Sequence, residues 1–369
     1  MKYFIVAGER SGDLHGGNLV KELKALDKEA TFTGFGGDYM ASNGVDIKVH
    51  YKELAFMGFL EVVLNLFKIR AYLKQCKNEI DHFQPDAIIL IDYGGFNMKI
   101  AKYAKANGIA VHYYISPKVW AWNQNRALKL KKIVDRMYVI LPFEKAFFQK
   151  FDWKVNYVGN PVLDAVKAHS KKPISIENKD KDIVAILPGS RLQEITSVLT
   201  GIKEVIKSLP NAYFVIAAVD NIDSHVYDQV RDFPNVEFVY DRTYDLLAVS
   251  KVAIVTSGTA TLETALWKVP QIVIYKTSGL SYSIAKRLIK VNYISLVNLI
   301  IGKLLVKELI QNDFNHVNLS TELETLLDND NYRNKMIEGY NEIERMLDTG
   351  SASSNTANLI YKYCVENKA

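Results

Sequence analysis

Residues Val252–Glu263, with the sequence V-A-I-V-T-S-G-T-A-T-L-E, decide the fold expected for this chain. The first four form a continuous apolar run rich in β-branched residues, which predicts a buried strand. Thr256–Thr259 then supplies the residues of a turn and a helix N-cap, and Ala260–Trp267 predicts a short helix. A strand that ends in such a loop and opens a helix is typical of an anion site, because helix N–H groups and the positive end of the dipole point outward.

This stretch contains four candidates for binding a phosphate and its sugar. Gly258 would let a phosphate approach the backbone, and the hydroxyls of Ser257 and Thr259 would donate to it. Glu263 lies about one turn into the helix, and Ala260, three positions before it, excludes a capping box. Such a carboxylate suits the two hydroxyls of a ribose. A solvated glutamate in an ordinary strand-to-helix turn is the alternative interpretation.

Length and composition fit two globular domains. The chain has 369 residues, of which 49% are hydrophobic and 24% charged. Its net charge of +5 suits an anionic substrate or membrane surface and is weak evidence for nucleic acid, which we do not expect as a partner. The two cysteines, Cys76 and Cys364, offer neither a disulfide framework nor a thiolate zinc site. Because signal-peptide features and a membrane-length apolar run are missing, we expect a soluble cytoplasmic protein with possible membrane association.

The strand–glycine loop–helix pattern occurs at the start of both halves of the chain. It begins with Tyr3–Ala7 in the first half and with Ile183–Leu187 in the second. We therefore expect an α/β protein with two Rossmann-like domains and parallel sheets. The predicted divisions are a first domain at 1–168, a polar linker at 169–182, a second domain at 183–345 and a C-terminal helix at 346–369, which could return to the first domain or be exchanged in a dimer. Further strands are expected at Thr31–Gly36, Ala87–Ile91, Ala110–Ile115, Met137–Leu141, Val155–Val158, Tyr213–Ala218, Val236–Tyr240 and Gln271–Tyr275.

Polar side chains follow several strands of the first half. Because ligands of open α/β sheets bind beyond the carboxyl ends of the strands, these side chains are expected to converge on one site, although any single one could be an ordinary loop residue. The candidates are Glu9, Ser11, Asp13, Asp92, Asn97 and Ser116.

Ser190 and Arg191 follow the first strand of the second half and are placed to bind a diphosphate. An arginine can grip such a group with two parallel hydrogen bonds, whereas a solvated residue at a helix start is the alternative. The chain has no G-x-x-x-x-G-K-[ST] motif and no H-x-x-x-H pair, so neither a P-loop nor a histidine metal site is indicated. We expect no metal and no cofactor, and a sugar transferase with a carboxylate base is the chemistry that fits.

The segment Leu54–Phe67 is apolar nearly all round and continues into a basic run. It predicts either a buried core helix or a helix that lies on an anionic membrane. The residues proposed for a membrane or acyl-chain surface are Phe56, Met57, Phe59, Leu60, Val63, Leu64 and Phe67.

Eight motifs, in order and with matching spacing, resemble the lipid-A-disaccharide synthase family. The resemblance runs from residue 4 to about residue 311. The motifs are Gly8–Asp13, Glu53–Val62, Ile91–Asn97, Ser116–Trp122, Leu141–Glu144, Leu187–Arg191, Ser257–Glu263 and Tyr293–Ile300.

The resemblance implies a GT-B fold, with two domains facing a cleft, and an inverting, metal-independent glycosyltransferase. Its substrates would be UDP-2,3-diacylglucosamine and 2,3-diacylglucosamine 1-phosphate (lipid X), and its products the β-1′,6-linked disaccharide 1-phosphate and UDP. It would act as a peripheral protein on the inner face of the inner membrane, and it could form a homodimer by exchanging C-terminal segments.

The resemblance also implies roles for single residues. Asp92 matches the proposed base, Glu9 an essential acidic residue, and Arg191, Glu263 and Asn298 residues associated with UDP. Three departures from the family pattern leave these residues in place. They are Arg10 in the first motif, Gly94 and Gly95 in place of a proline and a second aspartate, and Val297 in place of a proline.

Two other functions remain compatible with the sequence. Another UDP-sugar enzyme, such as a UDP-N-acetylglucosamine 2-epimerase, would not need the apolar segment Leu54–Phe67. A non-catalytic nucleotide-sugar-binding protein would not need the acidic loops of the first half.

Overall fold

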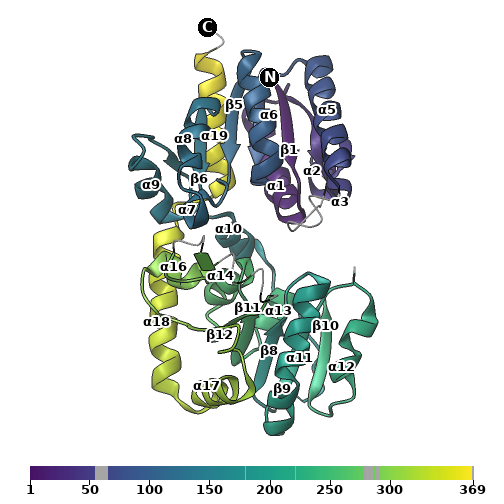
Figure 1. Cartoon of the computed structure of the whole chain (residues 1–369), viewed down its shortest axis with the longest axis vertical. Helices are drawn as coiled ribbons and strands as arrows, with labels where there is room; N and C mark the ends of the chain where they lie inside the picture. The colour runs from purple at the N-terminus through teal and green to yellow at the C-terminus, as the bar shows by residue number, and fades with distance from the viewer. Residues whose placement is uncertain are drawn as a thin grey trace. The chain divides into compact units, whose positions relative to one another are not determined.

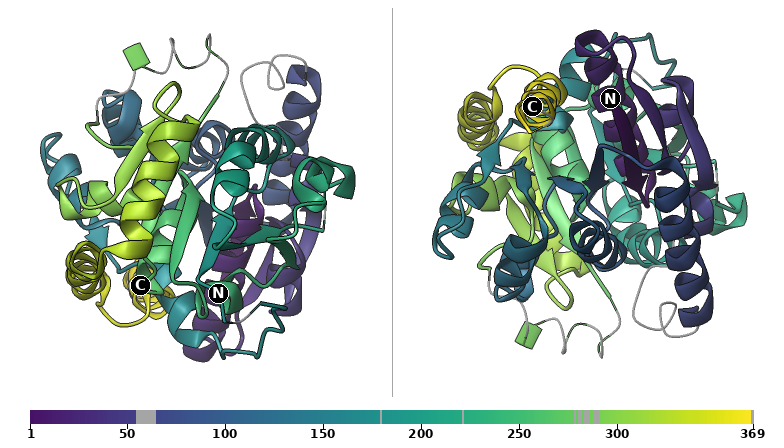
Figure 2. Two further views of the ribbon diagram at one scale, coloured as in Figure 1. Left: turned by 90° about the horizontal axis from the view of Figure 1, so that it is seen from below. Right: turned by 90° about the horizontal axis from the view of Figure 1, so that it is seen from above.

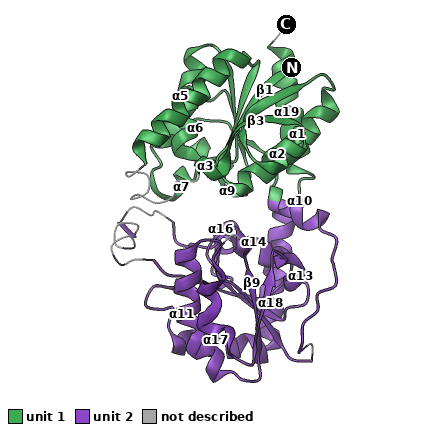
Figure 3. Ribbon diagram, turned by 90° about the vertical axis from the view of Figure 1, so that its right-hand side faces the viewer, with its two compact units in different colours: residues 1–161, 348–369 green, residues 162–347 purple. Residues whose placement is uncertain are grey.

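The computed structural model describes residues 1–54, 65–178, 180–220, 222–277, 279, 282, 286–287 and 291–367. These residues form two compact units (Figure 3). Unit 1 consists of Met1–Pro161 and Asp348–Ala369, and unit 2 of Val162–Leu347. Each unit contains one parallel sheet with helices between its strands, which confirms the predicted α/β fold with two Rossmann-like domains.

Unit 1 contains a seven-stranded sheet in the order β3-β2-β1-β4-β5-β6-β7. Its strands are β1 Lys2–Ala7, β2 Thr31–Gly36, β3 Val45–His50, β4 Ala87–Ile91, β5 Ala110–Tyr114, β6 Arg136–Val139 and β7 Asn156–Tyr157. Its helices are α1 Arg10–Leu26, α2 Asp38–Ser42, α3 Tyr51–Leu54, α5 Leu66–Phe83, α6 Gly94–Ala106, α7 Val119–Trp122, α8 Arg126–Ile133, α9 Pro142–Gln149 and α19 Ala352–Glu366, while α10 Pro161–Ala168 leads into unit 2.

Side chains alternate across this sheet and so divide its core into two layers. Tyr3 and Ile5 of β1 share a buried cluster with α1 and with Ile360 of α19, so the last helix belongs to the core of unit 1 (Figure 1). On the other face, the Phe4 and Phe35 ring centroids are 6.3 Å apart, and Phe35 lies at the same distance from Phe96 of α6. The views of Figure 2 show the helices on both sides of the strands.

Unit 2 contains a six-stranded sheet in the order β10-β9-β8-β11-β12-β13. Its strands are β8 Ile183–Leu187, β9 Tyr213–Ala218, β10 Val236–Tyr240, β11 Val252–Thr256, β12 Gln271–Tyr275 and β13 Lys307–Ile310. Its helices are α11 Leu192–Ser208, the 3₁₀ turn η1 Ser224–Tyr227, α12 Asp228–Arg231, α13 Thr243–Leu247, α14 Thr259–Leu266, α16 Leu296–Ile301, α17 His316–Asp328 and α18 Asp330–Leu347.

The structure contains two strands that were not predicted, and it divides the chain into units at different residues from those predicted. β3 and β13 are edge strands, which pair on one side only; β3 alternates between buried and exposed residues, and β13 has only four. The contacts divide the chain after Pro161 instead of after residue 168. Residues 169–182, expected as a linker, lie within unit 2, and Ile176 is buried in its core.

Candidate active site

Polar side chains follow neighbouring parallel strands of unit 1. Glu9 follows β1, Asp92 follows β4, Ser116 follows β5 and Glu144 follows β6. The carboxyl ends of these strands meet at one edge of the sheet. The chain leaves β1 toward β2 and leaves β4 in the opposite direction, so Glu9 and Asp92 flank the switch point where open α/β sheets bind ligands.

Asp92 occupies a strained and heavily braced position. Its φ is 44° and that of Tyr93 is 46°, a left-handed conformation that costs roughly 1–3 kcal/mol for each non-glycine residue. The Tyr113 hydroxyl and Asn97 Nδ2 donate to the Asp92 carbonyl at 2.5 and 2.9 Å, and the Asp92 N–H donates to the Tyr114 carbonyl. These three hydrogen bonds fix the backbone from which the Asp92 carboxylate extends.

Burial raises the pKa of the Asp92 carboxyl, while the Lys118 cation and the Tyr93 N–H oppose the shift. A carboxyl with a raised pKa is a better proton acceptor once it is ionised, which suits a general base. The sequence singled out Asp92, and the structure adds this desolvated environment.

The loop that carries Glu9 packs against Tyr93, the residue that follows Asp92. A Cβ on Gly8 would lie 2.4 Å from the Tyr93 ring, so only glycine lets the ring pack against the loop after β1. Burial and the nearby Glu9 carboxylate raise the pKa of Tyr93 to about 12. The Tyr93 hydroxyl donates to the Leu54 carbonyl at 2.6 Å. Tyr93 therefore connects the Glu9 and Asp92 loops.

The other loop candidates of unit 1 differ in whether their side chains are exposed or are buried and hydrogen-bonded to the backbone. Ser11 is exposed. Asp13 is fully buried, and its carboxylate accepts hydrogen bonds from the N–H groups of Gly37, Tyr39 and Met40 at 2.7–3.1 Å, so it caps α2. Asn97 is fully buried beneath Asp92, where it holds the backbone.

Ser116 is tied to a carboxylate that the sequence did not single out as a site residue. Its hydroxyl donates to Glu144, which also accepts from Trp120 Nε1 at 3.2 Å and from the N–H groups of Ile140 and Leu141 at 3.1 and 2.8 Å. Burial raises the pKa of Glu144, although these hydrogen bonds favour its charged form. Glu144 thus joins the loops that follow β5 and β6.

In unit 2, the two predicted anion loops also flank a switch point, because β8 lies between β9 and β11. Gly189 has φ +101°, which favours glycine, and a Cβ there would lie 2.6 Å from Glu194 Oε2. Ser190 is exposed. Arg191 is 56% exposed and pairs with Glu194 at 2.9 Å. Such a surface pair contributes about 0–1 kcal/mol.

The Ser257–Thr259 loop stands directly before α14. The N-cap residue Gly258 makes no side-chain cap, and the position of a Cβ on it is open space. Its φ of 166° is ordinary extended backbone, so access explains this glycine better than conformation does. Thr259 is exposed, and the Ser257 hydroxyl donates to the Ile294 carbonyl at 2.9 Å. The N–H groups of Thr259 and Ala260, at the start of α14, are therefore the candidates for binding an anion, whereas that of Thr261 donates to the Gly258 carbonyl.

Glu263 lies in the second turn of α14. It is half-buried, and Oε1 accepts a 2.7 Å hydrogen bond from the Tyr244 hydroxyl. Burial raises the pKa of Glu263, and the Tyr244 hydrogen bond opposes the shift. The side chain is thus held by its own unit, and the interpretation as a solvated glutamate does not fit.

Asn298 is fully buried and fully hydrogen-bonded. Its Nδ2 donates to Val306 O and to Glu308 Oε1 at 2.9 and 2.8 Å, and its Oδ1 accepts from the N–H groups of Leu305 and Val306. Glu308 also binds the N–H groups of Ile294 and Ser295. Since the Ile294 carbonyl accepts from the Ser257 hydroxyl, Asn298 is linked through Glu308 and Ile294 to the Ser257–Thr259 loop.

We therefore predict that Asn298→Ala acts mainly on stability. The loss of four hydrogen bonds in a buried site should lower the unfolding free energy of unit 2 by about 2–3 kcal/mol. UDP affinity should fall less than in Arg191→Ala, because Arg191 would contact the ligand itself. Thermal unfolding and UDP titration check both effects, with the exposed Asn312→Ala as control. A stable variant with UDP affinity as poor as that of Arg191→Ala would contradict this account.

Most residues predicted for the membrane surface, namely Phe56, Met57, Phe59, Leu60, Val63 and Leu64, lie outside the described residues. Phe67 is described, and at 83% exposure it stands open near the start of α5, next to Lys68. Among the helices that the structure describes, none has the length and apolar character needed to cross a membrane.

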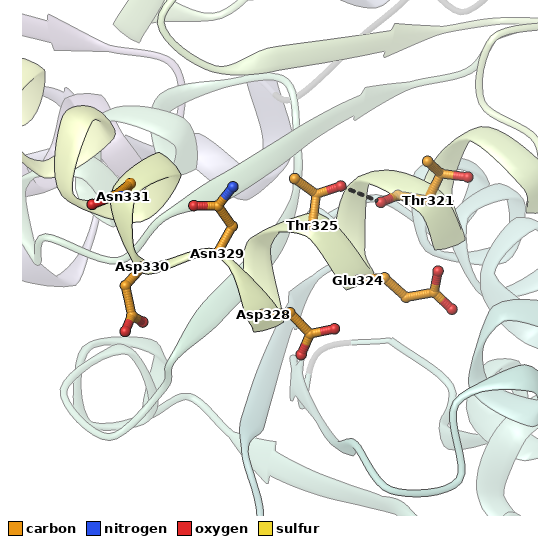
Figure 4. A pocket seen from close by; sticks show the side chains of 7 residues that line it. All are labelled: Thr321, Glu324, Thr325, Asp328, Asn329, Asp330 and Asn331. Atoms are coloured by element: carbon orange, nitrogen blue, oxygen red, sulfur yellow. Dashed lines mark hydrogen bonds between the residues drawn. The ribbon is translucent and has the colours of Figure 1, made fainter.

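A hollow of about 770 Å³ lies at the turn from α17 to α18, in another part of unit 2 (Figure 4). Its lining includes the carboxylates of Glu324, Asp328 and Asp330, which would repel a diphosphate. We therefore do not place the nucleotide there. Over the described ranges, no group of three or more histidine, cysteine, aspartate or glutamate side chains is arranged to hold a metal ion.

Comparison with known proteins decides the family. A family model described as Lipid-A-disaccharide synthetase matches residues 3–360. The chain belongs to the lipid-A-disaccharide synthase family. The lipid-A-disaccharide synthase of Syntrophus aciditrophicus is 38% identical over 96% of this chain and 95% of its own length, and that of Coxiella burnetii is 36% identical over 97% of both. This confirms the resemblance found in the motifs and makes the chain an enzyme, a glycosyltransferase of lipid A biosynthesis.

Solved structures share the fold of this lipid-A-disaccharide synthase family member. A glycotransferase of kitacinnamycin has a TM-score of 0.68 at 14% identity and covers 98% of both chains. UDP-GlcNAc 2-epimerase from Neisseria meningitidis, bound to UDP-GlcNAc, has a TM-score of 0.66 at 16% identity and covers 100% of both. At these identities the likeness shows the GT-B fold alone, which glycosyltransferases and such epimerases have in common.

Proposed function

We propose that the protein condenses UDP-2,3-diacylglucosamine with 2,3-diacylglucosamine 1-phosphate, giving the β-1′,6-linked disaccharide 1-phosphate and UDP. The observation that carries the proposal is the Asp92 carboxyl at the switch point of unit 1, where burial raises its pKa and where the Glu9 loop packs against the adjoining Tyr93, in a member of this family. Such a carboxyl is matched to the removal of a proton from a sugar hydroxyl.

In the proposed reaction, Asp92 accepts the proton of the acceptor 6-hydroxyl. The acceptor oxygen then bonds to the anomeric carbon of the donor, and the bond between that carbon and the UDP oxygen breaks with its electron pair leaving on UDP. Attack from the face opposite the leaving group inverts the configuration. Glu9 would orient the acceptor near Asp92.

Unit 2 would bind the UDP portion. We assign the diphosphate to Arg191, Ser190 and the N-termini of α11 and α14, where positive charge and N–H groups meet a developing anion. Glu263 would accept hydrogen bonds from the ribose hydroxyls. This arrangement stabilises the leaving group without a metal or a cofactor. We further propose that the protein binds peripherally to the anionic inner face of the inner membrane, through the apolar–basic segment that continues into α5. We also propose that two copies of the chain can form a homodimer.

UDP release from UDP-2,3-diacylglucosamine, measured in mild detergent with and without lipid X, tests the proposal. Release that requires lipid X supports the transferase. Release without the acceptor would indicate a hydrolase or an epimerase-like reaction, and UDP binding without turnover would indicate a binding protein. Either of the last two results would overturn the proposed function.

The pH dependence gives a second test. Asp92 accepts a proton only when ionised, and burial raises its pKa, so kcat/KM should fall as the pH drops through a midpoint above the usual aspartate value of about 3.9. Lys118 opposes that shift, so Lys118→Met should move the midpoint to higher pH. The exposed Lys129→Met serves as the matched control. An unmoved midpoint in Lys118→Met would argue against Asp92 as the titrating base.

A further inference from the structure

The Glu263 carboxylate has a single hydrogen bond within the described part of the chain. Tyr244 of α13 donates to Oε1 at 2.7 Å, and the donor lies 19 positions earlier in the sequence. A carboxylate attached by one oxygen keeps the other oxygen available, and the hydrogen bond restricts its rotation. The geometry therefore presents a preset acceptor at the second turn of α14.

The Tyr244 ring is itself fixed by two other rings. His169 meets it edge-on with centroids 5.3 Å apart, and Trp267 lies 5.8 Å away at 47°. His169 and Trp267 also contact each other at 5.8 Å. The three rings come from three separate segments, and together they leave the Tyr244 hydroxyl little freedom to move away from Glu263.

A charged cluster next to Tyr244 holds His169 in this arrangement. Asp245 is buried and accepts from His169 Nε2 and from the Lys172 N–H at 2.9 Å, and from Arg242 Nε at 2.9 Å. Burial alone would raise the pKa of Asp245, but these hydrogen bonds lower it to about 2. Arg242 also donates to the carbonyls of Lys172 and Pro173 at 3.2 and 2.8 Å. Residues 169–173 are thereby fixed against α13.

We infer that Tyr244 is a positioning residue for nucleotide-sugar binding, which holds the Glu263 carboxylate so that its second oxygen accepts from the ribose hydroxyls of a uridine nucleotide. The inference rests on the proposed role of Glu263. Tyr244 acts through Glu263 and does not itself touch the nucleotide. His169 and Trp267 set its orientation.

Calorimetric titration with UDP and with 2′,3′-dideoxy-UDP tests this inference, because the analogue lacks both ribose hydroxyls. Tyr244→Phe should raise the Kd of UDP about 5- to 10-fold, an effect in the range of one ordinary hydrogen bond. It should leave the Kd of the analogue within about twofold of wild type. Adding Tyr244→Phe to the Glu263→Gln variant should lower the affinity for UDP little further, since the group that Tyr244 positions is already changed.

Tyr332→Phe is the matched control, because the Tyr332 hydroxyl donates to Glu322 at the same distance of 2.7 Å. It should bind both nucleotides as wild type does. If Glu263→Gln weakens UDP but Tyr244→Phe does not, or if Tyr244→Phe weakens both nucleotides alike, the inference about Tyr244 is wrong. If Glu263→Gln itself leaves UDP affinity unchanged, the proposed role of Glu263 is wrong and the inference falls with it.

Discussion

Replacing Asp92 by asparagine should lower kcat about 10²- to 10⁴-fold while UDP affinity stays within about twofold of wild type. The side-chain shape is kept, and asparagine tolerates the left-handed backbone at this position. The amide cannot take a proton from the acceptor hydroxyl. The UDP groups that we assign lie in unit 2, so donor binding should survive. Steady-state kinetics with lipid X and calorimetric titration with UDP measure the two effects.

The stability of the same variant separates a catalytic role from a structural one. Burial raises the pKa of Asp92 in the folded state. At a pH above that pKa, the ionised carboxylate therefore destabilises the folded protein. This destabilisation is lost as the pH falls through the folded-state pKa toward the unfolded-state value, because the buried carboxyl then becomes protonated. Asp92→Asn should therefore melt at the same temperature as wild type or higher at pH 7. Asp152 is an exposed aspartate that also has a positive φ, so Asp152→Asn is the matched control. A variant that loses activity and melts well below wild type would favour a structural role.

Replacing Glu144 by alanine should cost unit 1 about 2–4 kcal/mol of unfolding free energy. The change leaves four donors without their acceptor, and three of them, the Trp120 indole and two backbone N–H groups, cannot rotate toward another partner. Removing a carboxylate whose pKa burial has raised offsets part of this loss. Glu144→Gln should be intermediate, because its amide nitrogen would face donors at one of the two oxygen positions.

Urea unfolding followed by tryptophan fluorescence measures this loss. Three of the four tryptophans, Trp120, Trp122 and Trp153, lie in unit 1, so the signal reports mainly on that unit. The exposed Glu29→Ala in the same unit should stay within about 0.5 kcal/mol of wild type. A Glu144→Ala protein as stable as Glu29→Ala would mean that the network joining the loops after β5 and β6 contributes nothing measurable.

The buried strands could be predicted from sequence because each is a short apolar run closed by turn residues. β4 and β8 occur at the predicted residues for this reason. β3 and β13 were not predicted. Val45, Ile47 and Val49 of β3 do alternate with polar residues, a strand signal that was missed, whereas the four residues of β13 are too few to show either a continuous apolar run or a clear alternation. Similarly, the polar composition of residues 169–182 indicated a linker, but Ile176 and the contacts of His169 attach this stretch to unit 2.

Sequence alone determined the alternation of most strands and helices, the family motifs and the residue types at the loops, because these depend on local spacing and chain order. Only the tertiary structure decided which of those side chains are available to bind a ligand. Asp13 and Asn298 have the same polar character as Glu9 and Arg191, yet they are buried and used to hold backbone. The partners Tyr113 and Tyr244 carry no local signal, since they meet their targets across 21 and 19 positions of chain. Burial and hydrogen bonding over such separations arise only when the sheet brings the loops together.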